Sequence, residues 1–315
     1  EVVDPQAQAK RATEREAKVS AGLEEADLWV RDLVRQGLVA AQERPSSFWE
    51  NTAARMVDAQ APGIARMVRE MPSIPSSGAG WMDRLLERLG QLNLLLEGYR
   101  RLDTLSPTLQ SDVRSLIGWT QTQDDLLAES GLRDRWRIMG QAMEAQEKLR
   151  IQRLWLLGEE SGRYALVLNF AHGNLPFDVT LLPGTLVDTE MVFFRSNYPQ
   201  RAIVKARHGS PASFDAMPGV ATIAEAIESH AAALAQLPWL ERSPMSLLAV
   251  LPVYQEERWF LRDQNNTVLP LAPRFEGGWQ LMALSGGHPM TVFGEWDGSA
   301  FQPLSVWSEK RFVGV

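Results

Sequence analysis

A helix start, two adjacent aromatic residues and a helix stop lie within residues 46–64, which read Ser-Ser-Phe-Trp-Glu-Asn-Thr-Ala-Ala-Arg-Met-Val-Asp-Ala-Gln-Ala-Pro-Gly-Ile. Ser47 with Glu50 three residues later has the pattern of a capping box, in which each side chain accepts a backbone hydrogen bond at the helix start. Apolar residues recur at helical spacing, at Phe48, Ala53 and Met56. Pro62 ends the segment, because the residue before a proline avoids the helical region. We predict a short helix around which neighbouring helices pack.

Amphipathic segments on both sides of this helix favour a helical domain. Residues 5–20 are charged and have almost no apolar stripe, whereas an apolar face runs from Leu23 to Leu38. The strongest helical pattern is an apolar residue at every third or fourth position, at Trp81, Leu85, Leu89, Leu92, Leu95 or Leu96, Tyr99 and Leu102. Ser106-Pro107 then supplies an N-cap and a first-turn proline.

Helical spacing continues after Gly131, at Leu132, Trp136, Met139 and Met143. The charged residues Arg133, Asp134, Arg135 and Arg137 fit a solvated helix surface better than an interaction face. Because the connections are short, the helices are expected to pack as a bundle. The sequence therefore predicts an all-α helical bundle domain over residues 1–150.

The pattern changes after Arg150, where short apolar runs separated by Gly, Asn, Pro and Asp replace the helical stripes. The predicted strands are Arg153–Leu157, Tyr164–Phe170, Phe177–Leu182, Glu190–Phe194, Arg201–Ala206, Leu247–Tyr254, Arg258–Leu261, Thr267–Leu271, Trp279–Leu284, Met290–Trp296 and Phe301–Trp307. One helix is predicted among them, over residues 219–237. Residues 151–315 are thus predicted to form a β-rich domain, and the fold class is α+β.

The two β-rich stretches resemble each other. Leu154-Trp155-Leu156-Leu157 parallels Arg258-Trp259-Phe260-Leu261, and Met191-Val192-Phe193-Phe194 parallels Met290-Thr291-Val292-Phe293. The offset stays near about 100 residues. We infer a duplicated five-strand unit, with repeats over 151–210 and 246–315 joined by the helix at 219–237. The pattern fits two small sheets as well as one closed barrel.

Composition excludes several classes of protein. The 315 residues include no cysteine, which excludes disulfides and thiolate metal sites within them. No apolar run is long enough to span a membrane, and no signal segment opens the chain, so a cytoplasmic location is the default. The net charge is −7, and acidic residues outnumber basic ones in both halves, which disfavours direct nucleic-acid binding.

The sequence offers little catalytic chemistry. Its histidines are His172, His208, His230 and His288, and no two have a metal-ligand spacing. Phosphate-binding glycine loops and nucleophile elbows are missing. Glu159-Glu160 and Asp124-Asp125 are adjacent carboxylates that do not face a common substrate. We therefore expect no catalytic, cofactor-binding or metal site and no enzyme, although a dispersed site that holds His172, His208 or His288 beside a carboxylate stays open.

Several segments resemble the region that follows the zinc finger in bacterial SWIM zinc-finger family proteins. They are Leu28-Trp-Val-Arg-Asp-Leu-Val-Arg-Gln-Gly-Leu38, Phe48-Trp-Glu with Ala54-Arg-Met-Val-Asp-Ala-Gln-Ala-Pro-Gly63, Leu116-Ile-Gly-Trp-Thr-Gln121, Asp134-Arg-Trp136, Trp155-Leu-Leu-Gly158 and Leu284-Ser-Gly-Gly-His-Pro-Met-Thr-Val-Phe-Gly-Glu-Trp-Asp-Gly298. The defining zinc knuckle of that family needs cysteines, so its ligands match no residue of this chain. Zinc is expected only if a finger precedes Glu1.

The resemblance implies two functions. Such proteins are often encoded beside MoxR-type AAA+ ATPases and von Willebrand factor A domain proteins, which implies a non-enzymatic adaptor that works with both. SWIM fingers are thought to bind nucleic acid or protein, so the alternative is the scaffold of a zinc-finger nucleic-acid-binding protein whose finger lies outside this chain. Protein partners are expected, and a membrane is not.

Overall fold

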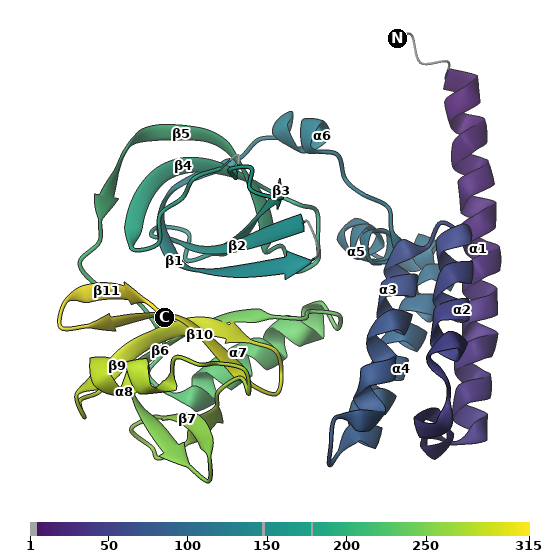
Figure 1. Cartoon of the computed structure of the whole chain (residues 1–315). Coiled ribbons are helices and arrows are strands. Elements are labelled where there is room, and N and C mark those ends of the chain that lie inside the picture. Colours follow the sequence, from purple (N-terminus) through teal and green to yellow (C-terminus); the bar gives the residue numbers. More distant parts are fainter. Residues whose placement is uncertain (1–4, 147–148, 178) are drawn as a thin grey trace. The chain divides into compact units, whose positions relative to one another are not determined.

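The computed structural model describes residues 5–146, 149–177 and 179–315 (Figure 1). Contacts divide the chain into two compact units. The first extends to Gln121 and includes Arg195–Asn197, and the second contains Thr122–Phe194 and Tyr198–Val315. The predicted α+β class is confirmed, since a helical bundle precedes a β-rich region.

Within the described residues, the regular elements of the first unit are all helices. Its elements are α1 (Pro5–Gln36), η1 (Leu38–Glu43), α2 (Ser46–Asp58), α3 (Pro62–Glu70), η2 (Met71–Ser76), α4 (Trp81–Arg100), η3 (Leu102–Thr104) and α5 (Pro107–Ile117), where η is a 3₁₀ helix. The leucine stripe of α4 is buried as predicted, at Leu85, Leu89, Leu92, Leu95 and Leu96. Ser106 caps α5 as predicted, since its hydroxyl accepts from the Leu109 N–H.

Helix α2 packs against α1, α3 and η2, whereas α4 packs against α1, α3, α5, η1 and η2, so the prediction of α2 as the central helix is not confirmed. The ends of α2 also differ from those predicted. Trp49 is buried, and its ring meets those of Trp29 and Phe48 at 5.7 and 5.4 Å between centroids. The predicted capping box is wrong, because Pro45 is the N-cap and Ser46 already lies in the first turn. Glu50 instead forms an ion pair with Arg69 of α3. Pro62 starts α3 rather than ending α2, which stops at Asp58.

Two glycines let α3 and α5 meet at backbone distance. A Cβ on Gly63 would lie 1.8 Å from the Leu116 carbonyl oxygen, and one on Gly118 would lie 2.6 Å from the Pro62 ring. Gly118 also has a φ of 140°, in the region that glycine tolerates best. The start of α3 and the end of α5 therefore pack only if these positions lack side chains.

We expect Gly63→Ala to destabilise the bundle by about 1–3 kcal/mol or more, because the added methyl overlaps backbone that cannot move alone. Gly90→Ala in α4 is the matched control, since a Cβ there meets nothing within 4 Å. Helix propensity makes that change stabilising by about 0.8–1 kcal/mol. Denaturant unfolding followed by far-ultraviolet circular dichroism measures both. Equal stability of the two variants would contradict this packing.

In the part of the second unit that the structure describes, a short α6 (Gln123–Leu127) is followed by eleven strands and two further helices. The strands are β1 (Leu132–Gln146), β2 (Leu149–Gly158), β3 (Tyr164–His172), β4 (Thr185–Phe193), β5 (Arg201–Ser213), β6 (Ser243–Gln255), β7 (Arg258–Arg262), β8 (Val268–Pro270), β9 (Met290–Trp296), β10 (Phe301–Ser308) and β11 (Arg311–Gly314). The helices are α7 (Ile223–Gln236) and α8 (Gly278–Ser285). α7 lies within the predicted 219–237.

Strands β1 to β5 form a closed barrel in the order β1-β2-β3-β5-β4, seen as a ring in Figure 1. All its pairs are antiparallel except β3 with β5, where Leu166 faces Arg201 and Val167 faces Ala202. A five-stranded barrel of this order has the topology of the OB-fold. Its interior is apolar and holds Trp136, Ile138, Leu154, Leu156, Val167 and Met191.

Strands β6 to β10 repeat this order. Their sheet runs β11-β10-β9-β6-β7-β8, and one parallel bridge from Leu271 to Phe301 brings the end of β8 beside β10. The pairs β6–β7, β7–β8, β6–β9 and β9–β10 match β1–β2, β2–β3, β1–β4 and β4–β5. The inferred five-strand repeat therefore has a structural counterpart, whose copies are β1–β5 and β6–β10.

The boundary predicted at residue 150 is wrong, because residues 132–146 form β1 rather than a helix. The first repeat accordingly begins at Leu132 and not at residue 151. A bulge between Ile138 and Gly140 shifts the alternation of this strand by one residue. Trp136 packs inside the barrel, Met139 packs toward the second sheet and Met143 is exposed, so their helical spacing does not reflect a common buried face.

Two predicted strands are absent. Trp279–Leu284 lies in α8, because a short apolar run fits a helix as well as a strand, and Gly286 ends it in the left-handed region. Residue 178 is outside the described part, and residues 177 and 179–182 form no strand. Leu181 still packs in the barrel core, and the Val179 carbonyl accepts from the Asn169 side chain. Strand β11 had no sequence prediction.

The barrel packs against the second sheet through a shared apolar cluster. Its buried members are Met139, Trp155, Leu157, Leu186, Phe214, Met217, Phe293 and Leu304. Trp155 lies on the outer face of β2, while its repeat counterpart Trp259 packs toward the core of the second sheet. A slip of one residue in a strand exchanges faces, so the two tryptophans match in sequence but not in orientation.

Candidate functional site

A cavity of about 440 Å³ lies between the barrel and the second sheet. The barrel contributes β1 and β2, and the sheet contributes β9, β10 and their connections. Its charged lining residues are Arg153, Arg242, Glu295 and Asp297. This cavity brings a buried carboxylate together with two arginines, and it is therefore the first candidate site.

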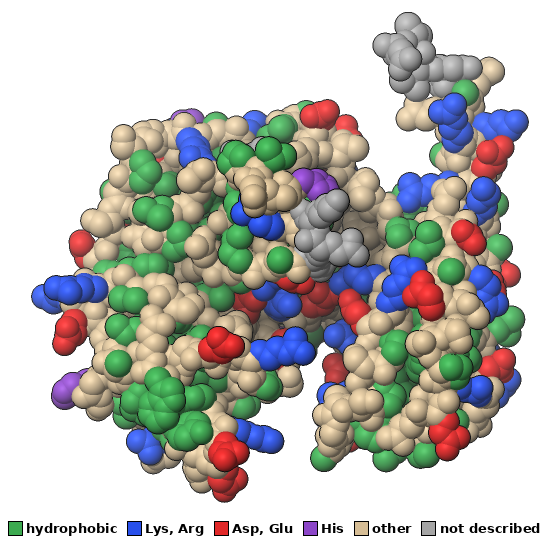
Figure 2. Space-filling view, in the orientation of Figure 1, with side chains coloured by type: hydrophobic (Ala, Val, Ile, Leu, Met, Phe, Trp, Pro, Cys, Tyr) green, Lys and Arg blue, Asp and Glu red, His purple; other side chains and the backbone are tan. Residues whose placement is uncertain are grey.

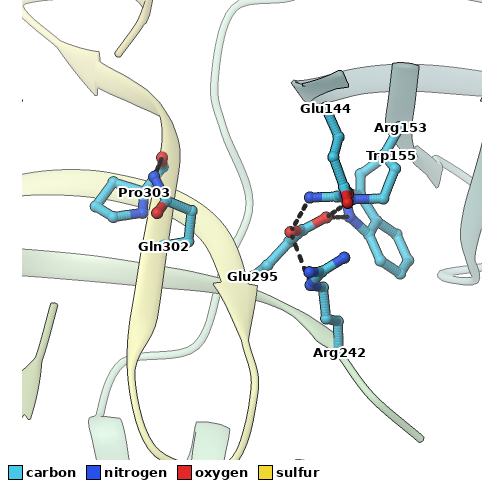
Figure 3. Close-up of polar contacts among 7 residues, drawn as sticks. All are labelled: Glu144, Arg153, Trp155, Arg242, Glu295, Gln302 and Pro303. Carbon is cyan, nitrogen blue, oxygen red and sulfur yellow. Dashed lines mark hydrogen bonds and ion pairs between the residues drawn. The ribbon is translucent and has the colours of Figure 1, made fainter. Parts of the chain in front are cut away.

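Glu295 is the centre of this group (Figure 3). Its side chain is only 2% exposed and accepts from both nitrogens of a bidentate arginine, Arg153 Nε at 3.0 Å and Nη2 at 3.1 Å. Trp155 Nε1 donates to the same carboxylate at 2.9 Å. Arg242 Nε lies 3.6 Å away, and Glu144 pairs with Arg153 from the other side at 2.8 Å.

Strand geometry positions these groups. Arg153 and Trp155 are two residues apart on β2, so both project from the outer face of the barrel toward β9. Burial tends to lower the pKa of Arg153, but the carboxylates of Glu295 and Glu144 outweigh burial and raise it. Both oxygens of Glu295 are thus occupied by fixed donors. The arrangement joins the barrel to the sheet.

A second candidate is an exposed group of rings that we call the aromatic cluster, Tyr254, Trp259 and Trp279. The Trp259 centroid lies 4.8 Å from that of Tyr254 and 5.0 Å from that of Trp279. Tyr254 and Trp279 are 46% and 67% exposed. Figure 2 shows hydrophobic side chains gathered over β7 and α8, the elements that contain Trp259 and Trp279. Exposed tryptophan and tyrosine are typical of protein-binding surfaces.

Local sequence explains this cluster. Tyr254 and Trp259 face each other across the β6–β7 hairpin, whose turn residues Glu256 and Glu257 have positive φ. Gly278 is buried against the Trp259 ring, 2.2 Å from where its Cβ would be, so α8 starts close to the hairpin and brings Trp279 to it. The predicted strands that contain Tyr254 and Trp259 are consistent with this pairing. The contact of Trp279 was not predicted, because residues 279–284 were placed in a strand rather than in α8.

The charged residues of β1 are paired. Arg133 forms a bidentate contact with Asp188, and Arg135 and Arg137 both contact Glu159. Asp134 is buried and accepts from the Ser161 hydroxyl and N–H. Burial tends to raise the pKa of Asp134, but its hydrogen bonds outweigh burial and hold the pKa below the usual value. This segment is therefore a strand surface tied to its neighbours, and not the solvated helix surface that was predicted.

The structure does not bring the histidines together. His172 ends β3, His288 follows α8, and neither lines the three described pockets. His208 lies opposite Asp188 in the barrel, and its Nε2 is buried with no hydrogen-bond partner in the described residues. His230 is buried on α7, and its Nδ1 lies 2.7 Å from the Ser243 hydroxyl.

His230 gives a prediction for pH dependence. Burial lowers the pKa of His230 below 6.5, against a smaller opposing effect of Asp297. The unfolded chain therefore binds more protons here, so stability falls as the pH drops below about 6.5 toward the folded pKa. The midpoint of urea unfolding at pH 5 and pH 8 measures this. His230→Gln is expected to reduce the pH dependence, and an unchanged slope would contradict it.

The sequence has no cysteine, and within residues 5–146, 149–177 and 179–315 no three His, Asp or Glu side chains are grouped to hold a metal ion. Among the described helices, none combines the length and the apolar composition needed to cross a bilayer.

Comparison with known proteins identifies part of the chain. Residues 14–117 match the model of the SWIM-associated four-helix bundle domain. The match ends with α5 and covers about a third of the chain, so the resemblance predicted from the sequence is confirmed for the helical unit. No curated protein and no solved structure matches the chain.

Proposed function

We propose that this protein is a non-enzymatic adaptor whose role is to bind other proteins. The observation that carries the proposal is the aromatic cluster, three adjoining rings of which one tryptophan is mostly exposed. Burying the exposed surface of such a tryptophan against a partner stabilises a complex by about 1.5–3 kcal/mol. The match to a SWIM-associated bundle adds support, since that domain is defined by its association with another module.

The partners that we propose are a MoxR-type AAA+ ATPase and a von Willebrand factor A domain protein, in the cytoplasm. This step rests on the resemblance of the sequence to SWIM zinc-finger family proteins. The engagement of the Glu295 carboxylate by Arg153 and Trp155 is consistent with a structural rather than a catalytic role for the cavity.

Co-purification tests the proposal. A tagged full-length chain is expected to retain both partners encoded nearest to it, and its addition is expected to change the ATP hydrolysis rate of the ATPase. Retention of neither protein, together with an unchanged hydrolysis rate, would remove the proposed function.

The second candidate is a nucleic-acid-binding protein in which this chain is the scaffold for a finger outside it. One observation favours it. OB-folds bind oligonucleotides on the outer face of their second and third strands. In the second repeat this face of β7 carries Arg258 and Arg262, with Phe260 between them.

The same face of the first repeat is unavailable. Trp155 of β2 and Tyr164 of β3 pack there against Phe293 of β9. A fold alone does not decide function, and the net charge of −7 opposes binding to phosphates. Salt-sensitive binding of the chain to single-stranded DNA or RNA would favour this candidate over the adaptor, and no binding at low salt would exclude it.

A further inference from the structure

The aromatic cluster carries acidic residues at its edge. Glu256 and Glu257 form the turn between Tyr254 and Trp259, and Glu276 lies three residues before Trp279. All three carboxylates are exposed, and none has an ion-pair or hydrogen-bond partner in the part of the chain that the structure describes. We call these six residues the aromatic–acidic surface.

Strand alternation removes most of the neighbouring positive charge from this surface. Tyr254 pairs with Trp259, and Gln255 pairs with Arg258, so Arg258 projects from the opposite face of the hairpin. Arg262 has the same parity as Arg258 and also projects away. Arg274, in the loop before α8, is two residues from Glu276 in sequence. The surface is therefore aromatic and locally negative.

We propose, on the premise that the chain acts by binding proteins, that the aromatic–acidic surface binds an extended segment of a partner that is rich in arginine or lysine. A guanidinium or ammonium group is attracted to the face of tryptophan and tyrosine rings. Carboxylates beside the rings attract the remaining cations of the same segment and steer its approach. This names the chemistry of the partner segment, which the proposed adaptor function leaves open.

The ring geometry fits this occupant. The Trp259 and Trp279 planes are nearly perpendicular, at 89°, and Tyr254 is inclined to them by 42° and 47°. The rings are in contact and leave no slot between them, so a cation stacks on the outward ring faces rather than entering a cage. Trp279, the most exposed ring, is the main platform.

Fluorescence anisotropy with a labelled, capped peptide tests the proposal on the full chain. The probe alternates glycine with arginine, and its matched control replaces each arginine by uncharged citrulline. The arginine peptide is expected to bind with a Kd between about 10 µM and 1 mM, and the citrulline peptide at least about fivefold more weakly. Added salt is expected to weaken only the arginine peptide.

Variants locate the binding. Trp279→Ala is expected to weaken binding about fivefold or more, and the Kd of Trp279→Phe is expected to lie between those of the wild type and Trp279→Ala. Glu256→Gln with Glu257→Gln is expected to weaken it about threefold at low salt. Leu182→Ala is the apolar control, because Leu182 is also 67% exposed, and Glu309→Gln in the β10–β11 turn is the charge control. Neither control is expected to change the Kd.

Three binding results would overturn the proposal: no binding of the arginine peptide, equal binding of the citrulline peptide, or an unchanged Kd in Trp279→Ala. A fourth contrary result is self-association of the chain that Trp279→Ala abolishes, because the occupant of the surface would then be a second copy of the chain. Failure here is separable from failure of the proposed function. If wild type and Trp279→Ala both co-purify with the proposed partners but the peptide does not bind, the adaptor function stands and this surface does not.

Discussion

Glu295→Ala is expected to destabilise the second unit by about 3–5 kcal/mol, because it leaves Arg153 with its bidentate partner removed and only 14% of its side chain exposed. Trp155 Nε1 also loses its acceptor in the buried interface between β2 and β9. Urea unfolding followed by tryptophan fluorescence measures the change. A loss below about 1 kcal/mol would contradict the role of Glu295 as the link between barrel and sheet.

Two further variants show whether the effect comes from an unpaired charge. Arg242 is 42% exposed and lies 3.6 Å from Glu295, so Arg242→Gln is expected to cost less than about 1 kcal/mol. Replacing both members of the buried pair, as Glu295→Leu with Arg153→Met, is expected to restore part of the stability lost in Glu295→Ala, because neither charge is left buried. A double variant less stable than the single one would contradict this explanation.

Trp136→Ala is expected to cost about 3–5 kcal/mol, because Trp136 is fully buried inside the barrel. Its Nε1 also donates to the Thr189 carbonyl of β4 at 2.9 Å. Met143→Ala on the same strand is the control, since Met143 is mostly exposed and its loss is expected to stay within about 0.5 kcal/mol.

This pair also distinguishes the barrel from the helix that the spacing predicted. In a helix over residues 132–143 both side chains would lie on one buried face, and both variants would be destabilised. Similar losses in the two variants would therefore contradict the assignment of these residues to β1.

Much of the fold could be predicted because local patterns agreed with the tertiary structure. The leucine stripe of α4 and the Ser106-Pro107 cap of α5 depend on neighbours in sequence, and both were correct. The repeat was visible because core positions recur: Met191 and Met290 both face the interior of their own five-strand unit. The errors arose where distant contacts decide the backbone. The bulge after Ile138 and the packing of Gly278 on Trp259 leave no local signal.

The candidate sites were less predictable than the fold. Glu295 is paired with Arg153, which is 142 residues away in sequence. No local sequence pattern predicts a contact over that separation. The aromatic cluster joins a hairpin to a helix that the sequence did not predict. The histidines were considered as members of a dispersed site, but they lie on separate elements of the structure.

Size-exclusion chromatography with light scattering tests the central claim most directly, that this chain acts by binding proteins. The full chain is mixed with the AAA+ ATPase and the von Willebrand factor A domain protein encoded nearest to it. We expect a peak that contains this chain of 35.2 kDa and whose mass exceeds that of each component. Elution of every component at its own mass, at concentrations of about 10 µM or more, would contradict it.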